Sequence, residues 1–267
     1  MTSGQTEPTT AAPSEAPAPP GPVRTYVRNT RTWTYSFLAI LPLLFAYEFL
    51  ILAYNKDDAV MIRVSADVWL TTALSKIGGQ WHLSMGTIVL LIGIFIILAE
   101  RRKKIDIRLR YLSLIVLEGL AYAIFLWLVL SFAVGQLFAH LPLADVESDF
   151  SNLDLGLQLA LSIGAGLYEE MVFRVIVVVG LAWLLCLAIE QKALAYVLSA
   201  IAGAFVFSLV HYIGTMSDVF DAPSFVFRFL FGLALNIILL TRGFGVAAWT
   251  HSLYNIVIVM VMWIKAG

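Results

Sequence analysis

Long apolar runs separated by short polar breaks dominate this chain. A helix needs about 20 residues to cross the hydrocarbon core of a bilayer, and most of the runs come close to that length or exceed it. They lie at Trp33 to Tyr54 and at roughly 83–99, 111–138, 154–189, 194–213, 225–241 and 244–263. The pattern therefore predicts an all-α, polytopic transmembrane helical bundle of about seven spans, with seven or eight both compatible with the breaks.

Two segments depart from simple spans. The stretch 59–77 mixes apolar Val64 and Val68 with charged Arg63 and Asp67, which is typical of a helix lying at the membrane interface. The run 154–189 would measure about 54 Å as one straight helix, far more than a core of about 30 Å. We expect it to tilt, bend or break, at the small residues 164–166.

Three parts follow along the sequence. Residues 1–30 are a Pro- and Ala-rich tail, and within it 1–22 has too little apolar surface to offset chain entropy, which predicts disorder. Residues 31–150 carry the N-terminal spans with a basic loop at 100–110, and 151–263 carry the remaining spans. The basic residues of that loop, together with those before Trp33, predict that the loop and the amino terminus face the cytoplasm.

Composition excludes several other classes of protein. Hydrophobic residues make up 60% of the chain and charged residues 13%, whereas a soluble domain has about a quarter charged. Basic and acidic residues nearly cancel, 17 against 18, so nothing indicates a nucleic-acid partner. The single cysteine, Cys186, lies in an apolar run and offers neither a disulfide nor a cysteine metal site.

Ionisable residues inside the predicted spans are functional candidates, because a charge at the centre of a bilayer costs about 2.5–3.5 kcal/mol on insertion scales. They gather in the C-terminal half, as Glu169, Glu170 and Arg174 in one span, His211 in the next and His251 in the last. Glu48 and Glu118 stand alone in earlier spans, where we interpret them as interhelical hydrogen-bonding groups.

Helical spacing gives these residues provisional roles. Glu170 and Arg174 are four residues apart, so a salt bridge between them is expected. Glu169 is turned from Glu170 by about 100° on an α-helix and has no cation nearby in sequence, which makes it a candidate general base. Phe207 also lies four residues before His211.

The last span contains a second pair of polar residues, His251 and Asn255, one helical turn apart. Such a pair can donate two hydrogen bonds to a developing oxyanion. Glu169 and His211 both lie about 30 Å from the turn at 190–192, whereas His251 lies about 12 Å from a turn at Gly243 on the same side. We expect helix tilt to bring the glutamate and both histidines into one polar cavity.

These residues, taken together, resemble the motifs of one family. The sequence Glu169-Glu170-Met171-Val172-Phe173-Arg174 is similar to its first motif, Phe207-Ser208-Leu209-Val210-His211 to its second, and His251-Ser252-Leu253-Tyr254-Asn255 to its third. The family is the CAAX protease and bacteriocin-processing (CPBP/Abi) family of intramembrane endopeptidases. The resemblance covers about 154–260, and Val175 departs from the Gly that many members carry there.

The resemblance implies a glutamate-type endopeptidase, with 151–263 as its catalytic core in the membrane of a bacterial cell. Glu169 and His211 would activate water, His251 and Asn255 would stabilise the oxyanion, and other residues of the motifs would support them, namely Glu170, Arg174 and Phe207. The substrate would be a membrane-associated peptide or lipidated protein, prenylated or of bacteriocin type.

Three alternatives stay open at this point. The family has been described as metal-dependent, and Glu169, His211 and His251 could hold zinc with a water in the fourth position. A proton-coupled transporter would also place Glu and His within spans, although the inverted repeats typical of many transporters are not evident. A catalytically inactive scaffold that binds a membrane partner is the third alternative.

Overall fold

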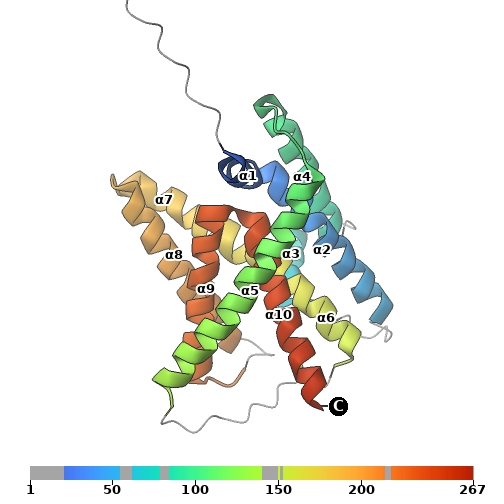
Figure 1. Cartoon of the computed structure of the whole chain (residues 1–267), viewed down its shortest axis with the longest axis vertical. Coiled ribbons are helices and arrows are strands. Elements are labelled where there is room, and N and C mark those ends of the chain that lie inside the picture. Colours follow the sequence, from blue (N-terminus) through green and yellow to red (C-terminus); the bar gives the residue numbers. More distant parts are fainter. Residues whose placement is uncertain are drawn as a thin grey trace, which may run out of the picture.

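The computed structural model describes residues 21–54, 62–78, 84–139, 150, 153–213 and 218–266, and these residues are helices and connections without a strand. Within these described residues, six helices are long and apolar enough to cross a membrane. They are α2 (Trp33–Tyr54), α5 (Leu109–Leu137), the continuous helix Leu155–Ala188, Lys192–Tyr212, α9 (Ala222–Arg242) and α10 (Phe244–Ala266). The predicted all-α transmembrane bundle is confirmed (Figure 1).

Shorter helices account for the difference between six spans and the predicted seven. The predicted span at 83–99 is α4 (Met85–Glu100), whose 16 residues reach only about 24 Å. The predicted interfacial helix is α3 (Ser65–Gly78), and α4 ends in a short 3₁₀ turn, η1 (Arg101–Lys103).

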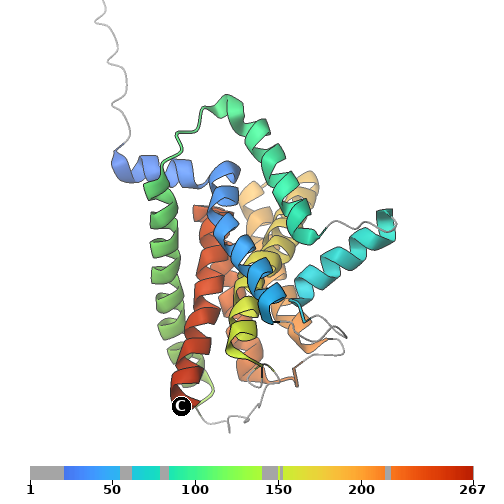
Figure 2. The ribbon, with the colours of Figure 1, turned by 90° about the vertical axis from the view of Figure 1, so that its right-hand side faces the viewer.

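The structure corrects the prediction of a tail over 1–30. Residues from Pro22 to Thr30 form a helix, α1, which lies across the bundle beside the start of α5 (Figure 2). Proline suits the first helical position because its missing N–H would have no partner there. Residues 1–20, with most of the predicted disorder, lie outside the described part of the chain, as does most of the acidic loop after α5.

Polar residues at the breaks set where helices begin and end. The side chains of Ser84, Asp154 and Asp221 accept hydrogen bonds from backbone N–H groups in the first turns of α4, α6 and α9. Gly243 ends α9 with a positive φ of 99°, which favours glycine, and α10 begins at the next residue. This tight turn places α9 and α10 side by side.

The long helix changes its winding where the sequence predicts a break. It starts as α6 (Leu155–Gly164), continues as a π-helix, η3 (Ala165–Val179), and ends as α7 (Gly180–Ala188). It runs obliquely through the molecule and turns back into α8 (Lys192–Leu209) at the predicted turn (Figure 1). Tilt of this kind offsets the difference in depth between Glu169 and His251 that straight vertical helices would give.

Helix α10 packs against α2, α5, α6, η3 and α9, and so lies at the centre of the bundle. Small residues allow its backbone to approach its neighbours closely. A Cβ atom on Gly166 of η3 would lie 2.5 Å from the backbone nitrogen of Ser252 and 2.7 Å from the carbonyl oxygen of Ala248. A Cβ on Gly119 of α5 would lie 2.9 Å from Cβ of Trp249. The π-helix that carries the glutamates is therefore held directly against α10.

Candidate active site

The two acidic residues of η3 have different surroundings. Glu170 is fully buried, and its Oε2 lies 2.9 Å from Nε of Arg174, whose side chain is only 1% exposed. The predicted salt bridge is therefore present. A buried carboxylate requires such a partner, because an uncompensated charge in an apolar environment is strongly destabilising.

His251 of α10 lies beside both carboxylates. Its Nδ1 is 2.8 Å from Oε1 of Glu170, and its Nε2 is 4.0 Å from Oε2 of Glu169. Because a carboxylate can only accept, His251 donates its Nδ1 hydrogen to Glu170. The other ring nitrogen is left facing Glu169, at a distance too long for a hydrogen bond.

The π-helical winding explains why two consecutive glutamates reach one histidine. On an α-helix, neighbouring side chains diverge by about 100°. A π-helix closes its hydrogen bonds over five residues, so each turn holds more residues and consecutive side chains diverge less. Sequence spacing predicts Glu169 on its own, turned away from Glu170, whereas in the structure both face α10. The contact between Glu170 and His251 was not predicted.

His211 lies in η4 (Val210–Tyr212), a 3₁₀ turn that continues α8. Its Nδ1 is 2.8 Å from the carbonyl oxygen of Phe207, to which it donates, so Nε2 keeps its lone pair. The charges that act on this ring are those of Glu169, Arg228 and Asp218. His211 therefore presents a hydrogen-bond acceptor close to the same carboxylate that His251 faces.

An aromatic side chain joins these groups. The ring of Phe207 is buried and contacts both histidines edge-on, with centroid distances of 5.1 Å to His211 and 6.0 Å to His251. The guanidinium carbon of Arg174 lies 4.4 Å from the same ring centroid, a cation–π distance. Phe231 of α9 covers the other side of His251 at 5.2 Å. The motif phenylalanine thus separates the two histidines and holds the arginine.

Asn255 lies one turn after His251 on α10 and is half-buried. Its side chain forms no hydrogen bond with the described residues, so its amide is free for another partner. Two surface depressions near the start of α2 and the end of α4 are lined by none of the predicted site residues. The polar cavity expected from the sequence stays a prediction.

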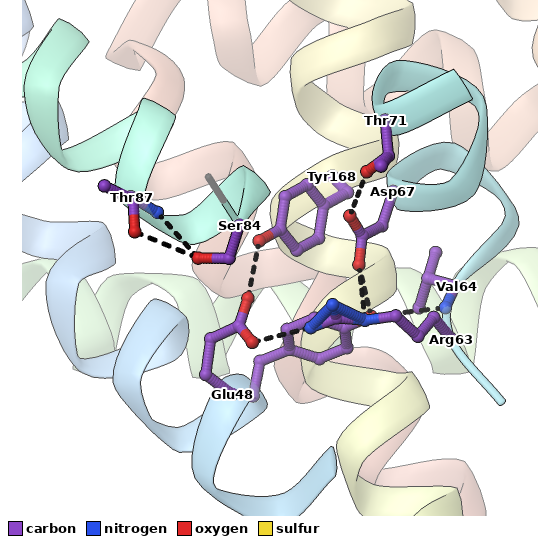
Figure 3. A network of polar contacts seen from close by, with 9 residues as sticks. Glu48, Arg63, Val64, Asp67, Thr71, Ser84, Thr87 and Tyr168 are labelled. Atoms are coloured by element: carbon purple, nitrogen blue, oxygen red, sulfur yellow. Dashed lines mark hydrogen bonds and ion pairs between the residues drawn. The ribbon is translucent and has the colours of Figure 1, made fainter. Parts of the chain in front are cut away.

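A polar network behind the site was not predicted as part of it. The hydroxyl of Tyr168, the residue before Glu169, donates to Glu48 of α2 at 3.3 Å. Arg63 connects Glu48, at 2.6 Å, with Asp67 of α3, at 3.0 Å (Figure 3). The interhelical role expected of Glu48 is confirmed. The four-residue spacing of Arg63 and Asp67 was the available signal, but spacing does not reveal which helix such a pair will face.

A second network at the opposite end of the bundle confirms the interhelical role expected of Glu118. This residue of α5 accepts hydrogen bonds from Arg242 at the end of α9, at 2.5 and 2.7 Å, and from Tyr26 of α1 at 2.7 Å. The network attaches α1 to the bundle.

Glu169, His211 and His251 stay a prediction as ligands of a zinc ion. Zinc places its nitrogen and oxygen ligands about 2.0–2.2 Å from the ion. Among the described residues no group of three His, Cys, Asp or Glu lies close enough to hold an ion. His251 keeps Nε2 for another partner, because only its Nδ1 contacts Glu170.

Comparison with known proteins finds one similarity, in the C-terminal part of the chain. Residues 151–257 match the family model described as type II CAAX prenyl endopeptidase Rce1-like. This range agrees with the 154–260 over which the motifs resemble the CAAX protease and bacteriocin-processing family. No curated protein and no solved structure matches the chain significantly.

Proposed function

We propose, from the match of residues 151–257 to the model of Rce1-like type II CAAX prenyl endopeptidases, that the protein hydrolyses a peptide bond of a membrane-associated substrate. The multi-pass helical bundle suits such a substrate, because its scissile bond would be presented within or at the bilayer. The membrane that we propose is that of a bacterial cell.

The observation that supports this proposal best is that Glu169 and Glu170 have different surroundings. Glu170 forms an ion pair with Arg174 and contacts His251, and its carboxylate is fully buried. Glu169 is 17% exposed, and the one basic side chain paired with it among the described residues is His251, whose Nε2 lies 4.0 Å from Oε2 of Glu169. A base must be free to take a proton, so we assign Glu169 to catalysis and Glu170 to positioning.

The proposed reaction starts with a water held between Glu169 and Nε2 of His211. Glu169 takes a proton from this water as its oxygen bonds to the carbonyl carbon of the scissile peptide. The electron pair of the carbonyl bond moves to oxygen and forms a tetrahedral oxyanion. When this intermediate collapses, the C–N bond breaks, and the leaving nitrogen takes the proton from Glu169. The products are a carboxylic acid and an amine.

The oxyanion would be stabilised from α10. In its imidazolium form, His251 can donate from Nε2 while its Nδ1 hydrogen stays bonded to Glu170. The free amide of Asn255 supplies the second donor. Donors fixed on one rigid helix need little reorganisation as charge develops, which is the physical basis of this kind of catalysis.

The substrate that we propose is a peptide or protein anchored by a prenyl group near its C-terminal end. The family match supports this choice over an unlipidated, bacteriocin-type peptide. Matched reporter peptides with and without a farnesyl group, reconstituted with the full chain in liposomes, distinguish the two. Cleavage of the unlipidated reporter alone would retain the endopeptidase and exclude the prenylated substrate.

The mechanism predicts that Glu169→Gln nearly abolishes cleavage while the protein still folds. The amide keeps the shape of the side chain but cannot accept the proton, so the rate of cleavage should fall by about 10²–10⁴-fold.

Asn255→Ala should lower kcat by about 10²–10³-fold with little change in KM. Glu190→Gln, at an exposed turn, is the matched control and should cleave normally. Full activity of Glu169→Gln would refute the assignment, and cleavage by no variant, the control included, would favour a transporter or scaffold.

A further inference from the structure

A basic depression of about 530 Å³ lies between α1 and the segment that joins α4 to α5. Figure 2 shows these elements together at one end of the bundle. Charged side chains in its lining come from both elements, namely Arg28, Lys103, Lys104, Asp106 and Arg108. The depression therefore combines four cations with one carboxylate.

Half of this positive charge is not neutralised. Lys103 pairs with Glu100 at 2.7 Å, and Arg108 pairs with Asp106 at 2.5 Å. The other two cations, Arg28 and Lys104, are exposed and form no ion pair with any described residue. Two uncompensated cations that face one depression attract an anion.

The backbone at Lys104, which lines the basic depression, has an uncommon conformation. Lys104 has a positive φ of 48°, and it alone among the described non-glycine residues does so. Its N–H donates to the carbonyl oxygen of Arg101 at 3.3 Å, which closes the turn after η1. A lysine in this conformation is strained where glycine would not be. The strained turn keeps a cation in the wall of the depression.

The depression lies at the level where membrane spans begin. Helix α2 starts at Trp33 and α5 at Leu109, and α1 lies across both starts (Figure 2). The ring of Trp33 is 40% exposed there, as is typical of aromatic residues at a membrane interface. The anions found at this level of a bilayer are the phosphates of lipid headgroups.

A second depression, of about 510 Å³, favours a lipid over a soluble anion as the ligand. It is lined by the apolar side chains of Phe95, Leu98 and Ala99 of α4 and by the cations Arg101 and Arg102. The next two residues of the chain, 103 and 104, line the basic depression. An apolar wall beneath a set of cations suits a ligand with an acyl chain and an anionic head.

We propose that the basic depression binds the headgroup of an anionic phospholipid, with an acyl chain of the same lipid along the apolar wall of α4. The site is separate from the glutamates and histidines of η3, η4 and α10, and it does not depend on the proposed proteolysis. A bound lipid connects α1 with the α4–α5 segment and so stabilises that end of the bundle.

Thermal unfolding of the full chain in neutral detergent tests this site. Phosphatidylglycerol should raise the Tm by about 2–6 °C over phosphatidylcholine with the same acyl chains, and native mass spectrometry should find it retained. The variant Arg28→Gln with Lys104→Gln should lose both effects. Removing exposed charges is not expected to prevent folding, and Arg28→Lys should keep most of the shift.

The matched control is Arg24→Gln with Lys192→Gln. It removes one arginine and one lysine that are also exposed but do not line either depression. The control should respond to phosphatidylglycerol as the natural protein does. Equal losses in both double variants would show attraction by net charge and overturn the site. Equal shifts from both lipids, or a full shift from inorganic phosphate alone, would also overturn the proposal.

Discussion

At the scale of single residues, the most informative feature is a buried carboxylate that contacts both an arginine and a histidine. Glu170 lies 2.9 Å from Arg174 and 2.8 Å from His251, and all three side chains are almost fully buried. In water such a cluster would contribute little, but within a bundle each charge depends on the others. The cluster therefore affects both the stability of the fold and the orientation of His251.

This dependence predicts a specific pattern of stability. Arg174→Met leaves Glu170 with His251 alone and should cost about 3 kcal/mol, the low end for breaking a buried pair. Adding Glu170→Gln removes the remaining charge and should restore part of the stability, since replacing both members of a buried pair can be nearly neutral. Thermal unfolding of the two single variants and the double variant in one detergent measures the coupling. Additive losses would contradict a direct pair.

At the scale of elements, the contact between η3 and α10 positions the candidate site. Gly166 lies against Ser252 one residue after His251, and Glu169 follows Gly166 by three residues. Close packing at this glycine determines the separation of the two helices at the point where their polar side chains meet. A small change in separation would therefore change the 4.0 Å between Glu169 and His251.

Gly166→Ala should accordingly destabilise the protein by about 1–3 kcal/mol, because the added methyl group meets backbone atoms that cannot move aside easily. Cleavage should fall more than thermal stability predicts, since the catalytic carboxylate is displaced. Gly180→Ala on the same long helix is the matched control, because a Cβ there has nothing within 4 Å. That variant should be neutral or slightly stabilised. A Gly166→Ala protein with normal stability and cleavage would contradict the packing.

At the scale of the whole molecule, the helices before residue 150 are part of the structural support of the site. Trp249 of α10 donates to the carbonyl oxygen of Ala39 in α2 at 2.7 Å, and Gly119 of α5 packs against the same tryptophan. Tyr168 is joined to Glu48 of α2. The family match begins at residue 151, yet the matched region packs on both of these helices.

We therefore expect residues 151–267 alone not to fold, because α10 would lose the partners on two of its sides. Co-expression of 1–150 with 151–267 should restore a folded complex, since the division falls in a connection between helices and the interfaces remain. Recovery of a detergent-stable complex, followed by its thermal unfolding, is the measurement. A stable and active 151–267 fragment would instead show that the two parts are independent domains.

The sequence by itself determined the features that depend on neighbouring residues. Apolar runs of membrane length placed α2 at Trp33–Tyr54, as in the structure, and the polar break at 190–192 gave the turn between α7 and α8. The spacing of Glu170 and Arg174 gave their salt bridge for the same reason, because both partners lie on one helix.

Only the tertiary structure decided the features that depend on how helices are wound and placed. The π-helical winding of η3 turned Glu170 toward His251, and its oblique path offset the expected difference in depth. Arg63 found its partner Glu48 on α2, and α1 formed where a tail was predicted, attached through Tyr26 to Glu118. Such contacts join residues 15 to 92 positions apart, and no local pattern encodes them. They arise because a buried charge takes whichever partner the packing of the helices brings within reach.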